Sequence, residues 1–196
     1  KTMETKLLAY FNSYKPKTFD NTTLGCAKNQ ECEPVIDPKT TPLAQASRYM
    51  PLNPFLRDEA KSMVEKMIKL GVLEETTKPA NSTIFIVQKS SGKWRLICDL
   101  RAYNKRLMKY IVHLPSPYEL INKICTFEIM SYFDYPDAYF QIGLSEYSRK
   151  TAPIVASVAG CVKNVQYLKM PQGLAIATAK FCDAMIEIYR PIEEFV

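Results

Sequence analysis

Residues 131–142 read Ser131-Tyr-Phe-Asp-Tyr-Pro-Asp-Ala-Tyr-Phe-Gln-Ile142 and join two apolar runs through a sharp turn. The run before the turn, residues 127–133, predicts a buried strand, and the run after it, residues 138–144, predicts a second one. The turn contains Pro136 and leaves Asp134 at the end of the first strand. A carboxylate in that position can face a cleft and hold a divalent cation, although an isolated Asp in such a sequence more often caps a turn.

Two further motifs accompany this stretch in a fixed order. Residues 86–105 upstream read Ile86-Val-Gln-Lys-Ser-Ser-Gly-Lys-Trp-Arg-Leu-Ile-Cys-Asp-Leu-Arg-Ala-Tyr-Asn-Lys105, and residues 168–174 downstream read Leu168-Lys-Met-Pro-Gln-Gly-Leu174. In this order and at these spacings, the three motifs resemble the fingers and palm of reverse transcriptases from LTR retroelements, of the Ty3/gypsy or retroviral type. The resemblance implies an α+β fold with reverse-transcriptase-like fingers and a partial palm, in which helices back a small antiparallel sheet.

The composition is that of a basic globular chain. The 196 residues include 26 Lys and Arg against 20 Asp and Glu, which gives a net charge of +6. This charge suits a phosphate-binding surface and, equally well, an ordinary basic protein. No apolar run reaches the roughly 18 residues that span a bilayer, and the first residues lack a signal-peptide pattern. We therefore expect no membrane partner.

The cysteine pattern bears on metals and on location. The chain has a single histidine, His113, and none of its six cysteines forms a CxxC pair: Cys26, Cys32, Cys98, Cys125, Cys161 and Cys182. This spacing argues against a zinc site and predicts reduced thiols in a cytoplasmic or nuclear setting. A loop disulfide between Cys26 and Cys32 is the alternative. Because the chain begins with Lys1 rather than Met, we expect a processed or excised piece.

Local patterns predict three regions. Residues 1–53 contain a short amphipathic helix at 3–14 and an extended arm at 15–53 with little regular structure and few buried residues. Residues 54–115 form a fingers-like region, and residues 116–196 form a partial palm-like region. In the fingers-like region, a helix begins at Pro54 and stops near Gly71. One face of this helix is an apolar stripe that we expect to pack in the core: Met63, Val64, Met67 and Ile68.

The remaining patterns predict two hairpins and two helices. The first hairpin joins residues 83–87 to 94–100 through a Ser-Ser-Gly turn, and the second spans 150–166 around Gly160. Helices are expected at 114–124, opening after Pro115 or Pro117, and at 178–188. In the first hairpin, alternation turns one face toward the core, where Trp94, Leu96 and Leu100 should be buried against the stripe of the preceding helix.

The opposite face of the first hairpin carries Arg95 and Arg101 next to a turn with two lysines, so it could clamp a phosphate or form a solvated strand face. The resemblance implies that Arg95, which follows the aromatic residue, contacts the triphosphate of an incoming nucleotide, and that a lysine of the turn, assigned to Lys89, does likewise.

The resemblance also implies roles around Asp134. This residue would be the first metal-binding carboxylate and would bridge two Mg²⁺ ions during phosphoryl transfer. Asp137 and Ala138 would offer backbone N–H groups to the triphosphate, and Tyr139 would act as a steric gate against a ribose 2′-hydroxyl. The turn with Gln172 and Gly173 would touch the nucleotide. The structural alternatives are a core aromatic for Tyr139 and an ordinary turn residue for Gly173.

The sequence also departs from the family pattern. Thr178 stands where Ty3/gypsy enzymes usually place Pro, and Pro153 stands where they usually place Phe. The Tyr-x-Asp-Asp strand that supplies the remaining metal ligands in the family is not among these 196 residues. A single carboxylate cannot hold two hard dications, so we expect this polypeptide not to polymerise DNA by itself and to bind Mg²⁺ weakly or not at all.

Two functions follow from these observations. The first is the fingers–palm part of an RNA-directed DNA polymerase, which would bind an RNA or DNA template–primer, dNTPs and, in the intact enzyme, Mg²⁺. The alternative is a domesticated, catalytically inactive domain that acts as a protein or nucleic-acid interaction module. In that case a protein partner would bind at the open palm edge.

Overall fold

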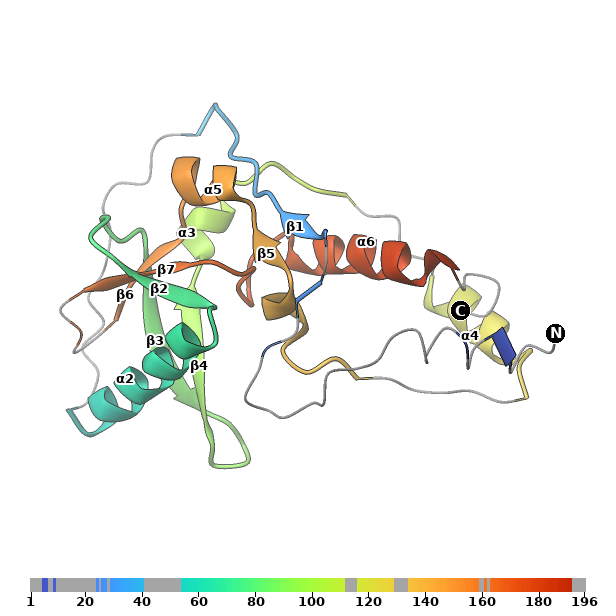
Figure 1. Cartoon of the computed structure of the whole chain (residues 1–196), viewed down its shortest axis with the longest axis horizontal. Helices are drawn as coiled ribbons and strands as arrows, with labels where there is room; N and C mark the ends of the chain where they lie inside the picture. Colours follow the sequence, from blue (N-terminus) through green and yellow to red (C-terminus); the bar gives the residue numbers. More distant parts are fainter. Residues whose placement is uncertain are drawn as a thin grey trace.

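The structure is a computed structural model, and it describes residues 5, 6, 9, 24, 26, 27, 29–40, 54–111, 116–128, 134–158, 161 and 163–191. A five-stranded sheet with the order β2-β7-β6-β3-β4 lies at one end of the molecule, on the left in Figure 1. Neighbouring strands are antiparallel, except that β3 and β6 run parallel. The strand bounds are β2 Leu73–Thr76, β3 Ser82–Gln88, β4 Trp94–Asp99, β6 Val155–Val158 and β7 Asn164–Tyr167.

Helix α2 (Pro54–Lys69) precedes the sheet and packs against β2, β3 and β4. The predicted stop at Gly71 is confirmed, because this residue has a φ of +68°. The N–H groups of Gly71 and Val72 donate to the carbonyls of Ile68 and Met67 at 2.9 and 3.0 Å. This pair of bonds is a Schellman motif, which satisfies the last carbonyls of the helix and favours glycine at the left-handed position.

The predicted first hairpin is confirmed as β3–β4, in which Val87 lies opposite Arg95. The predicted core face is confirmed for Leu100, which is 2% exposed, and for Cys98, and Leu96 packs partly buried against the same core. Trp94 was expected to be buried there and is only half-buried. It pairs with Gln88 beside the exposed turn and is not part of the core cluster, so the prediction for this residue is wrong.

Besides α2, the described residues form four helices and two short elements. The helices are α3 Arg101–Asn104, α4 Pro117–Ile124, α5 Glu146–Thr151 and α6 Ala177–Tyr189, and the short elements η1 Ala138–Gln141 and β5 Gly143–Leu144 lie between α4 and α5. Helix α4 begins at Pro117 with Ser116 as its N-cap. The Ser116 side chain accepts from the N–H of Glu119, whose side chain accepts from the N–H of Ser116. This capping box sets the helix start at the later of the two predicted prolines.

The two strands predicted around residue 134 are corrected by the structure. Phe127 follows α4 in irregular backbone and is 38% exposed, so the buried strand does not begin there, and residues 129–133 lie outside the described residues. The run 138–144 forms the 3₁₀ helix η1 and only then the two-residue strand β5. The chain turns instead of extending because Asp137 adopts the left-handed conformation, with φ 52°, before η1.

Backbone pairing and hydrogen bonds tie the described part of the N-terminal arm to the rest of the molecule. Its two-residue strand β1 (Glu31–Cys32) pairs in parallel with β5, and Ile36 forms a bridge with Leu107 after α3. Little regular structure was predicted here, and that is confirmed for residues 29–40. Cys32 and Pro34 are nevertheless buried, and Cys32 joins the core. The predicted helix 3–14 lies mainly outside the described residues.

The second hairpin is confirmed as β6 and β7, although Lys150 belongs to α5 rather than to a strand. The last predicted helix is confirmed as α6. All six cysteines are unpaired in the structure, so the alternative of a Cys26–Cys32 disulfide is not borne out. The reduced state of the thiols stays a prediction. Among the described residues, no helix is both long and apolar enough to cross a membrane.

Candidate functional site

The segment from Asp134 to η1 presents two carboxylates to solvent. Asp134 and Asp137 are both exposed. The side chain of Gln141 donates to the carbonyl of Pro136 at 3.0 Å and closes the turn between them. In the part of the chain that the structure describes, no hydrogen bond occupies the N–H groups of Asp137 and Ala138. Two backbone donors are therefore open at the start of η1.

Tyr139 is half-buried against helix α6. Its ring meets the ring of Phe181 edge to face, with 5.8 Å between centroids and an interplanar angle of 85°. Its hydroxyl lies 3.2 Å from the hydroxyl oxygen of Thr178. A neighbouring ring, that of Tyr135, also packs on Phe181, and its hydroxyl contacts that of Tyr189. The first turns of α6 thus fix the orientation of the Tyr139 ring.

A tight turn over residues 171–174 precedes α6. The N–H of Leu174 lies 3.4 Å from the carbonyl of Pro171, and Gly173 has a φ of +87°. A turn with positive φ at its third residue is of type II, which explains the glycine. Gln172 is exposed at the corner of the turn. The side chain of Asn104 reaches the turn from α3 and bonds Gly173 and Ala175.

The tip of the first hairpin carries the predicted phosphate-binding cations. The N–H of Lys89 donates to the carbonyl of Lys93 at 2.7 Å and so closes the turn. The side chains of Lys89 and Arg95 are exposed. Arg101 instead forms two charge-assisted bonds with Asp99, at 2.9 and 2.7 Å. These bonds lower the pKa of Asp99, and they engage Arg101 at the start of α3.

The structure does not join the predicted residues to one another directly. Among the described residues, no hydrogen bond or ion pair links any two of the predicted set: Lys89, Arg95, Asp134, Asp137, Ala138, Tyr139, Gln172 and Gly173. The links run instead through residues that were not predicted. Thr178 and Phe181 hold Tyr139, and Asn104 holds the turn with Gln172. That these residues line one concave surface stays a prediction.

The predicted metal site is incomplete within the described residues. No group of three or more His, Cys, Asp or Glu side chains is placed there to hold a metal ion. Asp134 offers a single carboxylate, whereas a hard dication such as Mg²⁺ demands octahedral oxygen coordination, usually with one or two carboxylates besides substrate and water. The described residues alone therefore do not fit a two-metal centre.

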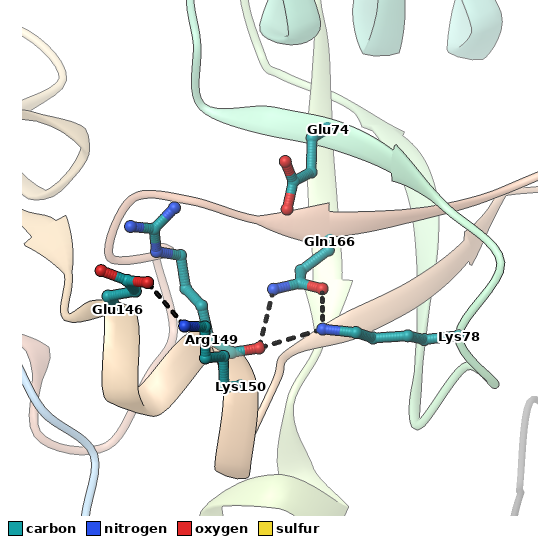
Figure 2. A pocket seen from close by; sticks show the side chains of 6 residues that line it. All are labelled: Glu74, Lys78, Glu146, Arg149, Lys150 and Gln166. Carbon is teal, nitrogen blue, oxygen red and sulfur yellow. Dashed lines mark hydrogen bonds and ion pairs between the residues drawn. The ribbon is translucent and has the colours of Figure 1, made fainter.

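A separate polar hollow lies between β2, β7 and α5 (Figure 2). Six side chains line it: Glu74, Lys78, Glu146, Arg149, Lys150 and Gln166. Gln166 is only 2% exposed, yet its amide is satisfied, because it accepts from Lys78 at 2.8 Å and donates to the Arg149 carbonyl at 3.0 Å. The hollow contains none of the predicted residues. Its bonds fasten the end of α5 to the sheet.

Sequence reasoning missed three residues that shape the candidate site. Asn104 lay inside the motif of residues 86–105, but nothing in its spacing indicated a partner some 70 residues away. Thr178 was noted only as a departure from the family pattern, and Phe181 was read as part of an ordinary helix. For Thr178 and Phe181, the signal that could have found them is their place in the first turns of a helix that follows the predicted turn.

Comparison with known proteins identifies a family that contains these motifs. Residues 87–196 match the family described as reverse transcriptase (RNA-dependent DNA polymerase). The Pol polyprotein of equine infectious anemia virus (isolate 1369) is 33% identical over 152 residues, which cover 74% of this chain and 13% of that polyprotein.

Two more relatives show the same kind of similarity. The retrovirus-related Pol polyprotein from transposon 297 of Drosophila melanogaster is 28% identical over 89% of this chain and 16% of its own length. The Gag-Pro-Pol polyprotein of Simian retrovirus SRV-2 is 31% identical over 67% of this chain and 8% of its own length. The chain thus matches only a small part of each relative. It belongs to the reverse transcriptase family, in the branch of LTR retroelements.

Proposed function

We propose that this chain is the fingers–palm part of an RNA-directed DNA polymerase and supplies Asp134 and most of the nucleotide-binding residues. The observation that carries the proposal is the family match over residues 87–196, which contains the hairpin strand β4, the segment of Asp134 and the turn of Gln172. The substrates would be dNTPs and a template–primer. The division into residues 1–53, 54–115 and 116–196 is part of this proposal.

The exposed groups support the proposed roles. Lys89 and Arg95 present two cations that no described carboxylate neutralises, which suits contact with a triphosphate. The open N–H groups of Asp137 and Ala138 would add neutral donors. Tyr139 would face the sugar, and Gln172 and Gly173 would touch the nucleotide from the turn.

Asp134 would be one ligand of the magnesium ions that this family normally uses. Because the described residues hold no complete metal site, the other carboxylates of the centre must come from elsewhere in the active enzyme. We expect the 196-residue polypeptide alone to bind Mg²⁺ weakly and to extend no primer.

Primer extension tests the proposal on the longest polypeptide that the same reading frame encodes. Extension should be detectable in the wild type and should fall to background in Asp134→Asn. Asp58→Asn, which changes an exposed carboxylate on α2, is the matched control and should retain full activity. A folded wild-type protein without extension would contradict the proposal and favour an inactive interaction module.

Binding to the 196-residue chain gives a second readout. Titration with dTTP should shift the NMR signals of residues near Arg95 and Gln172, and Arg95→Ala should weaken binding about tenfold, the effect of one lost charge-assisted contact. Arg57→Ala, which changes an exposed side chain on α2, is the control and should bind dTTP as the wild type does. Equal loss in both variants would point to a nonspecific charge effect.

A further inference from the structure

We propose that Asn104 is a positioning residue that fixes the turn of Gln172 and Gly173 from helix α3. Its side-chain N–H donates to the carbonyl of Gly173 at 2.9 Å, and its side-chain oxygen accepts from the N–H of Ala175, also at 2.9 Å. The nitrogen and the oxygen of the Asn104 side chain therefore each bond one backbone group, and these two groups belong to residues two positions apart. The role of the turn in nucleotide binding rests on the proposed function, whereas the two hydrogen bonds from Asn104 to the turn do not depend on it.

The backbone that carries Asn104 is itself firmly held. The N–H of Asn104 donates to the carbonyl of Leu100 at 2.7 Å. Its neighbour Tyr103 is 1% exposed and donates its hydroxyl to the Ala152 carbonyl at 2.8 Å. Asp99 accepts from the N–H and the guanidinium of Arg101, which anchors the other end of α3. The amide is thus presented by a rigid frame, and only its own torsions are free.

This arrangement connects two parts of the proposed site. Helix α3 follows directly on β4, the strand of Arg95, and Asn104 ends the helix. Asn104 therefore fixes the position of the turn of Gln172 relative to the strand that carries Arg95. A change in the position of the hairpin would reach the turn through one short helix and one side chain.

The two bonds also determine which groups of the turn remain available. The carbonyl of Gly173 and the N–H of Ala175 are occupied by Asn104, and the N–H of Leu174 faces the Pro171 carbonyl. Within the described residues, no hydrogen bond occupies the N–H groups of Gln172 and Gly173. The turn therefore offers donors outward, the chemistry that a phosphate or a base carbonyl of a nucleotide would accept.

A matched control exists within the same molecule. Asn81 makes the same pair of contacts elsewhere, because its side-chain N–H donates to the Pro153 carbonyl at 2.7 Å and its oxygen accepts from the N–H of Val155 at 3.1 Å. Substitution of Asn81 removes an equivalent amide without touching the turn. Effects that are specific to Asn104 can thus be separated from the loss of any bridging amide.

Residue-resolved amide hydrogen exchange on the 196-residue chain tests the inference. In Asn104→Leu, the N–H of Ala175 should exchange roughly tenfold faster, the factor that one hydrogen bond of ordinary strength contributes. The buried N–H of Tyr167, which donates to Ile154, should keep its rate. Asn81→Leu should leave Ala175 unchanged. Unchanged protection of Ala175 in folded Asn104→Leu would overturn the inference.

Asn104→Asp keeps the proposal testable if the leucine variant is globally destabilised. The introduced carboxylate can still accept from the N–H of Ala175, so the Ala175 amide should stay protected. It cannot donate to the Gly173 carbonyl, so the signal of the Leu174 amide, which shares a peptide group with that carbonyl, should shift. Below about pH 4 the carboxyl gains a proton and can donate again, so the Leu174 amide signal should return toward its wild-type position. Loss of Ala175 protection in this variant, or no pH-dependent return, would overturn the inference.

Nucleotide binding separates this inference from the proposed function. If wild-type protein binds dTTP, Asn104→Leu should bind it about tenfold more weakly, while Asn81→Leu should bind normally. Equal binding by Asn104→Leu would overturn the positioning role. If wild-type protein binds no nucleotide, the proposed function fails, and the exchange results still decide whether Asn104 fixes the turn.

Discussion

Tyr103 contributes to stability through a single buried hydroxyl. Among the described residues it is the largest of the almost fully buried side chains, and its hydroxyl donates to the Ala152 carbonyl. Burial raises the pKa of this phenol, so it stays protonated and remains a donor at all ordinary pH values. The bond joins the end of α3 to the segment after α5.

Tyr103→Phe should lower the free energy of unfolding by about 1–2 kcal/mol, because it leaves a buried carbonyl without its donor and removes no apolar contact. Urea unfolding measures this difference. Tyr147→Phe is the control, since Tyr147 is 64% exposed, and it should change stability by less than about 0.5 kcal/mol. Equal effects in the two variants would show that the Tyr103 bond contributes nothing.

At the residue scale, the exposure of a side chain can be predicted from the sequence more readily than its contacts can. Asp134, Arg95 and Gln172 are exposed, as chemistry at a surface requires. Their supports could not be predicted, because Thr178 and Asn104 act across long sequence separations. A side chain of ordinary polarity carries no local signal of such a partner.

Among the elements, the hairpin β3–β4 shows how burial varies along one face. Leu100 at its base is 2% exposed and belongs to the core, whereas Trp94 near the turn is half-buried. Leu100→Ala should therefore cost about 2–5 kcal/mol, the usual range for a buried leucine. Trp94→Ala should cost less, about 1–2 kcal/mol, because its ring lies outside the core cluster.

Thermal unfolding of the two variants checks this order. A larger loss for Trp94→Ala than for Leu100→Ala would mean that the turn end of the hairpin packs more tightly than the structure shows. Lys93→Ala, beside Trp94 and exposed, serves as the control for changes at the turn itself.

Elements with strong local signals could be predicted, and those that depend on turn conformation could not. Pro54 marks the start of α2 because proline restricts the backbone to a helical φ. Gly71 marks the end because glycine tolerates the left-handed conformation that follows a helix. The run 138–144 has the apolar content of a strand, but the left-handed Asp137 redirects the chain into η1. Asp tolerates that conformation without requiring it, so the sequence alone could not distinguish the two outcomes.

At the scale of the whole molecule, buried thiols make stability depend on pH. Burial raises the pKa of Cys32 and Cys98 from the ordinary value of 9.0 to about 12. In the unfolded chain these thiols lose their protons above about pH 9, whereas in the folded chain they keep them. Their contribution is therefore complete below pH 9 and is lost as the pH rises toward 12.

The free energy of unfolding should fall by about 1 kcal/mol per buried thiol between pH 9 and pH 10. Urea unfolding at pH 8, 9 and 10 measures the slope. Cys98→Ala should reduce the slope and leave the contribution of Cys32, whereas Cys125→Ala, which removes an exposed thiol, should leave the slope unchanged. A slope equal in both variants would exclude Cys98 as a source of the pH dependence.

The strand order β2-β7-β6-β3-β4 has a consequence for the nascent chain. The hairpin β3–β4 can close as soon as residue 99 has been synthesised, but β2 gains its neighbour only when residue 167 has followed. Until then, the edges of β2 and β3 carry unsatisfied backbone groups that other strands can bind. Incomplete polypeptides that end before β6 should therefore aggregate or recruit chaperones, whereas those that extend past Tyr167 should not.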